Sequence, residues 1–142
     1  AMIAGTLMIG PLDKRLGTRK WLILAVNSVG AVALALLAIF AAGPIWLAVA
    51  LIAMVGFFGA SFPVIIAHGR AFVPPHLAGR GVTLLNLFGI GGVGIMQFAS
   101  GRLHSSLAEA GAVLPYQALF AFFAAILALG CAIYLFSKDN MG

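Results

Sequence analysis

The sequence predicts an all-α fold: a polytopic transmembrane helix bundle with four full membrane helices and the end of a fifth. Of its 142 residues, 63% are hydrophobic and 8% are charged, and its mean hydropathy is +1.17. A soluble domain needs more polar surface to cover its core. Four apolar runs of about 22 residues can each cross about 30 Å of hydrocarbon as a helix. They do not alternate as barrel strands would, and backbone groups in lipid must bond within their own segment.

The elements follow in order along one partial transmembrane domain, residues 1–142. Residues 1–10 are apolar but too few to span a membrane. Lys and Arg residues follow this segment, whereas in a signal peptide they precede the apolar region. We therefore expect a fragment that begins inside a helix. A polar loop over 11–20 comes next. Gly43-Pro44 and Pro74-Pro75 break the apolar sequence between the expected helices, which are residues 21–42, 45–67, 81–103 and 115–136.

The cations predict the orientation. If the 11–20 loop is cytoplasmic, alternation of the helices puts the 68–80 link and the C-terminus on the same side. Seven of the eight Lys and Arg residues then lie inside, which follows the positive-inside rule: Lys14, Arg15, Arg19, Lys20, Arg70, Arg80 and Lys138. Only Arg102 lies opposite. The cations form no continuous basic face, so we expect no nucleic-acid partner, and we place the protein in a bacterial-type cytoplasmic (inner) membrane.

The loop carries a recognisable motif. It resembles the Gly-x-Leu-x-Asp-Arg-x-Gly-x-Arg-Arg signature of major facilitator superfamily transporters, and the matching residues are Gly10, Leu12, Arg15, Gly17, Arg19 and Lys20. The position of the signature acid is Lys14, and the acid stands one residue earlier, at Asp13, about 100° further round if the segment is helical. The alternative is that the cations only anchor the topology.

The resemblance implies a C-terminal fragment, from the end of helix 8 to helix 12 of a twelve-helix transporter. It implies secondary active transport of a small solute by alternating access, with the signature loop helping to hold one state. The partners would be the lipid bilayer, the remaining helices of the parent transporter and an unidentified small-molecule substrate. The link from His68 to Gly81 resembles the one between helices 10 and 11.

Two runs hold the candidate site residues. Asn86 and Gln97 are three helical turns apart and share a face of the third run, where they either line a substrate path or bond neighbouring helices. Ser61, in the second run, is another candidate for that path. His68 shares its face and could take up protons, but its place at the membrane edge favours a solvated side chain. Candidates for helix packing and flexibility are Gly56, Gly59, Pro63, Gly89, Gly92 and Gly94.

The remaining residue types point away from other functions. No Asp or Glu lies inside an apolar run, so the sequence offers no acidic proton relay there. The single Cys131 excludes a disulfide framework, and no metal-ligand cluster or nucleophile–base pair is present. We expect no cofactor, no metal and no enzymatic activity. Two alternatives to a transporter fragment are a structural or assembly subunit of a membrane complex and, less favoured, a small four-helix exporter.

Overall fold

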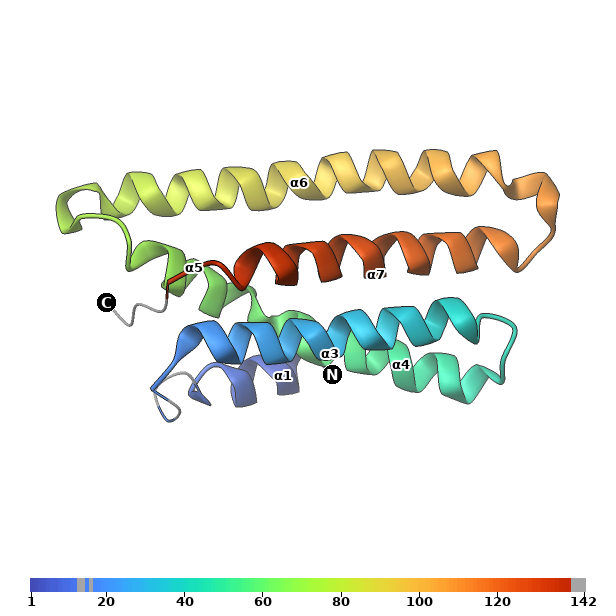
Figure 1. Cartoon of the computed structure of the whole chain (residues 1–142), viewed down its shortest axis with the longest axis horizontal. Helices are drawn as coiled ribbons and strands as arrows, with labels where there is room; N and C mark the ends of the chain where they lie inside the picture. The colour runs from blue at the N-terminus through green and yellow to red at the C-terminus, as the bar shows by residue number, and fades with distance from the viewer. Residues whose placement is uncertain (13–14, 16, 139–142) are drawn as a thin grey trace.

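The computed structural model describes residues 1–12, 15 and 17–138, and these fold as helices joined by short turns (Figure 1). The structure confirms the all-α transmembrane bundle. The elements are α1 (Met2–Ile9), α3 (Arg19–Ile39), α4 (Ile45–Phe58), the 3₁₀ turn η1 (Gly59–Ser61), α5 (Phe62–Arg70), the 3₁₀ turn η2 (Pro75–Leu77), α6 (Ala78–Ser106), the 3₁₀ turn η3 (Ala108–Ala110) and α7 (Leu114–Tyr134).

Four spans are long and apolar enough to cross a membrane: Arg19–Ile39, Ile45–Arg70, Pro75–Ser106 and Leu114–Tyr134. The first begins two residues before the expected 21–42 helix, because the Thr18 hydroxyl caps it and accepts a hydrogen bond from the Trp21 amide. The third extends beyond 81–103 at both ends. The expected bounds follow the apolar run, which excludes Arg80 and His104. The helix includes both residues in its terminal turns.

The second span is interrupted near its middle. Helix α4 ends at Phe58, η1 follows, and α5 begins at Phe62 with Pro63 in its first turn. A proline there costs no helical hydrogen bond, since the first amides of a helix have no partner. Figure 1 shows α5 leaving the line of α4. The second span therefore bends at this place.

Helix α3 is the centre of the packing. It lies along α7 over most of its length, and it also packs against α4 and α5. Buried side chains from α1, α3 and α5 form one apolar cluster, made of Ile9, Leu22, Ile23, Val26 and Val64. A second cluster joins α3 to α4 through Ala33, Leu37 and Leu51.

Helix α6 lies at the outer edge of the bundle, beside α5 and α7 (Figure 1). None of its residues is buried, and large apolar side chains such as Phe88 stand about three-quarters exposed. Such a surface is unsuited to water, but lipid tails are as apolar as the side chains themselves. A helix inside a membrane can therefore keep these apolar side chains exposed.

The turns gather at two ends of the bundle. The end of α1, the start of α3, the 71–77 link and the end of α7 lie at one end, and the 40–44 and 107–113 turns lie at the other (Figure 1). The orientation predicted from the Lys and Arg residues requires successive turns to lie at opposite ends, as they do here. The side of the membrane that each end faces stays a prediction.

Candidate functional site

Two glycines of the signature loop have different backbone conformations. Gly10 follows α1 with helical dihedral angles. Gly17 has φ of +66°, in the left-handed region that glycine occupies without steric cost, and no other atom lies within 4 Å of the position that a Cβ would take. The loop needs glycine at position 17 for its backbone rather than for space. Leu12 and Arg15 are exposed. Asp13 and Lys14 lie outside the described residues, so the consequence of the shifted acid stays a prediction.

The last two cations of the motif bind helix ends. The Arg19 guanidinium donates a long hydrogen bond of 3.5 Å to the carbonyl oxygen of Ala67, in the last turn of α5. The Lys20 ammonium donates one of 2.7 Å to the carbonyl oxygen of Leu135, which follows α7. The last carbonyls of a helix lack backbone partners and carry the negative end of its dipole. The two cations therefore join the start of α3 to the ends of α5 and α7.

His68 lies beside these contacts and is only 3% exposed. Its Nε2 is 3.1 Å from the carbonyl oxygen of Lys138, and its Nδ1 is hydrogen-bonded to the Tyr134 hydroxyl. Because a carbonyl only accepts, Nε2 must carry a hydrogen, and in the neutral ring Nδ1 then accepts from Tyr134. The expectation of a solvated His68 is wrong. The ring lies between α5 and the end of α7, where Phe72 also packs on it.

A second polar contact lies deeper in the spans. The Asn27 amide on α3 donates to the Ile23 carbonyl at 2.8 Å and to the Ser61 hydroxyl at 3.2 Å. Ser61 is 2% exposed, so in this structure it joins η1 to α3. Its predicted place on a substrate path stays untested. Sequence reasoning did not select Asn27, although an amide inside an otherwise apolar run is the signal that finds such a residue.

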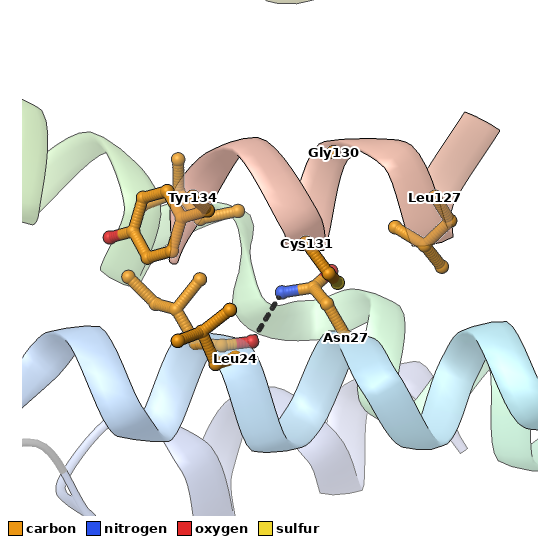
Figure 2. A pocket seen from close by; sticks show the side chains of 8 residues that line it. Leu24, Asn27, Leu127, Gly130, Cys131 and Tyr134 are labelled. Carbon is orange, nitrogen blue, oxygen red and sulfur yellow. Dashed lines mark hydrogen bonds between the residues drawn. The ribbon is translucent and has the colours of Figure 1, made fainter. Parts of the chain in front are cut away.

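A cavity of about 210 Å³ separates the two polar contacts (Figure 2). Asn27 of α3 and Tyr134 of α7 line it, one from each contact, and its other walls are mainly apolar side chains of α3, α5 and α7. Cys131 also lines it. The polar groups of Asn27 and Tyr134 already bond within the protein, so the surface of the cavity is mainly apolar. Within the described residues, no three His, Cys, Asp or Glu side chains gather into a group that could hold a metal ion.

The two amides of α6 stand apart from this cavity. Asn86 is partly exposed and Gln97 is exposed. In the described part of the chain, neither side chain has a hydrogen-bond partner on another helix. Their proposed role on a substrate path stays a prediction.

The predicted packing glycines differ in what they contact. A Cβ at Gly89 would lie 3.2 Å from the Phe62 ring of α5, and one at Gly56 would lie 3.9 Å from Ala1. Gly59, Gly92 and Gly94 have open space at that position. The closest approaches involve glycines that the sequence did not single out. A Cβ at Gly5 would overlap the Phe57 carbonyl oxygen of α4, and one at Gly69 would lie 2.7 Å from Leu85 of α6.

Comparison with protein families gives a match over nearly the whole chain. The family model described as Major Facilitator Superfamily matches residues 1–141. No curated protein and no solved structure matches the chain. The matched region includes the signature loop, the polar contacts around His68 and all four spans.

Proposed function

This chain belongs to the major facilitator superfamily, whose members are transporters rather than enzymes, and we propose that it serves secondary active transport of a small solute by alternating access. It is an integral membrane protein, with helices that require a lipid bilayer. The observation that carries the proposal is the pair of hydrogen bonds from Arg19 and Lys20 to the ends of α5 and α7.

Alternating access requires that a group of helices move as one body against another group. In lipid, no hydrophobic force holds helices together, so packing and polar bonds must do so. Arg19 and Lys20 bind α3 to α5 and α7 at one end, and Asn27 binds α3 to Ser61 near the middle. These bonds suit a group of helices that moves without separating.

The orientation belongs to the same proposal. The signature loop, the 68–80 link and the C-terminus face the cytoplasm, in a bacterial-type cytoplasmic membrane, because this arrangement keeps all but one of the cations inside. Leu12, Arg15 and Gly17 are exposed, and these residues of the loop are then available to hold one conformational state against the rest of the transporter. Gly17 itself has a positive φ, which glycine adopts without steric cost.

The proposed substrate path lies along the face of α6 that carries Asn86 and Gln97. Gln97 is exposed, and a side chain on this face can donate and accept hydrogen bonds to a polar solute. The opposite face of the same helix carries Phe88, nine residues away and therefore half a turn round the axis. That face suits lipid or apolar packing.

Cysteine labelling tests alternating access before the substrate is known. We would introduce Gln97→Cys into the complete protein on a Cys131→Ala background and label right-side-out and inside-out vesicles with a membrane-impermeant maleimide. A residue on an alternately open path reacts from both sides. The matched control is Phe88→Cys, which should react from neither. If Gln97→Cys is unreactive from both sides, or reacts no faster than Phe88→Cys, the substrate path is wrong.

The same assay tests the loop. Replacing Gly17 by Val places a β-branched residue at positive φ, which costs about 1–2 kcal/mol. We expect the balance of Gln97→Cys labelling between the two sides to change while the protein stays assembled. The control is Gly101→Ala, whose Cβ meets no other atom. An unchanged balance in Gly17→Val would favour a structural subunit over a transporter.

A further inference from the structure

A groove of about 480 Å³ opens at the end of the bundle that holds the signature loop. Arg19 from the start of α3 and Arg70 from the end of α5 both line it. Its other walls are small or apolar, with Ala67, Val73 and Pro75 among them. Ala78, the first residue of α6, completes the lining.

The groove lies at the depth of the lipid headgroups. Arg19 begins one membrane span, Arg70 ends the second, and Pro75 begins the third. The ends of spans coincide with the boundary between hydrocarbon and headgroups. A molecule in this groove can therefore have a polar group beside the arginines and an apolar part along the helices.

The charge of the groove favours an anion. Two guanidinium groups line it, those of Arg19 and Arg70. A guanidinium has several N–H donors, so Arg19 can donate to an anion as well as to the Ala67 carbonyl oxygen.

We propose that this groove binds the phosphate group of an anionic phospholipid. A guanidinium presents a planar fork of N–H donors that matches two phosphate oxygens, and Arg70 and Arg19 approach from two different helices. The apolar walls receive the first carbons of the lipid chains. A free phosphate would use the same donors, but it gains nothing from these walls. The lipid would join α3, α5 and α6 at one end. This inference does not rest on the proposed transport mechanism.

Native mass spectrometry of the complete protein, released from nanodiscs that contain phosphatidylglycerol and phosphatidylcholine, tests the site. The wild type should retain phosphatidylglycerol in preference to phosphatidylcholine. Arg70→Gln should weaken that retention by about tenfold, equivalent to the loss of one strong polar contact, and Arg70→Lys should recover part of it. The matched control is Arg102→Gln at the opposite end, which removes a cation stacked on Phe98 and should leave retention unchanged.

Three results would overturn the proposal. One is equal retention of the two lipids by the wild type, and another is an equal loss in Arg70→Gln and Arg102→Gln, which would mean that general charge attracts the lipid. The third is displacement of phosphatidylglycerol by millimolar inorganic phosphate, which would assign the groove to a soluble anion. A size-exclusion profile that matches the wild type shows that Arg70→Gln is folded. Partial recovery of phosphatidylglycerol retention in Arg70→Lys shows in addition that the loss in Arg70→Gln is not due to misfolding. No recovery in a folded Arg70→Lys also counts against the site.

Discussion

The ammonium group of Lys20, at the start of α3, donates a 2.7 Å hydrogen bond to the carbonyl oxygen of Leu135, at the end of α7. The two residues are 115 positions apart in the chain. In the sequence, Lys20 is one more cation of a basic loop. In the structure it caps the last span, so the same charge that is predicted to direct topology also joins the first and last spanning helices.

The first prediction concerns this contact. Lys20→Met should lower the stability of the protein by about 0.3–1 kcal/mol, the usual effect of removing a cation from the end of a helix. Thermal unfolding in detergent should show a melting temperature lower by a few degrees. Lys20→Arg keeps the charge and should stay within a degree of the wild type. If Lys20→Met and Lys20→Arg lower the melting temperature equally, the hydrogen bond to Leu135 does not stabilise the end of α7.

The second prediction is a double-mutant cycle on His68 and Tyr134. Tyr134→Phe removes only the hydroxyl and leaves Nδ1 of a buried ring without its donor, which costs about 1–3 kcal/mol. His68→Phe should cost at least as much, since it also removes the bond to Lys138. The double variant should be more stable than the sum of the two losses predicts, by about 0.5–3 kcal/mol. Denaturant unfolding measures all four proteins, and strict additivity would show that the two side chains do not interact.

The third prediction compares two glycines. Gly5→Ala should destabilise by about 1–3 kcal/mol, because the new methyl group meets the backbone oxygen of Phe57 and must push α1 from α4. Gly91→Ala should stabilise by up to about 1 kcal/mol, since its Cβ meets no described atom and alanine favours a helix. Thermal unfolding of both variants gives the comparison. A Gly91→Ala protein less stable than Gly5→Ala would contradict the packing of α1 on α4.

The fourth prediction tests the orientation. His76 in η2 and Glu109 in η3 are exposed and lie at opposite ends of the bundle. On a Cys131→Ala background, a membrane-impermeant maleimide added to intact cells should label Glu109→Cys and leave His76→Cys unlabelled until the membrane is opened. The reverse pattern would place the signature loop outside and contradict the orientation.

The four spans were predictable because a bilayer demands the same thing of every crossing segment: about 20 apolar residues whose backbone bonds are internal. The break near Pro63 was also predictable, since a proline restricts the helix that precedes it. The ends of the helices were less so. The Thr18 hydroxyl accepts a hydrogen bond from the Trp21 amide and so extends α3, and an apolar run gives no sign of that cap.

The polar contacts illustrate what sequence reasoning could not reach. His68 was expected to be solvated because it ends an apolar run, yet Tyr134 and Lys138, about 70 residues later, cover it. The depth of a residue along a span can be estimated by counting residues. Whether its side chain is buried depends on which helix packs beside it. Asn27 was passed over for the same reason, because its partner Ser61 stands 34 residues away.

The amino-acid sequence by itself determined the fold class, the number of spans and, through the signature loop, the resemblance to a transporter family that the family match then bore out. These follow from local properties: hydropathy, charge and residue spacing. Only the tertiary structure decided that Lys20 and Arg19 bind the ends of α7 and α5, that His68 is buried, and that Gly5 rather than Gly94 is closely packed. The reason is that lipid provides no hydrophobic force to distinguish one helix face from another, so the pairing of helices depends on shape and on a few polar bonds between distant residues.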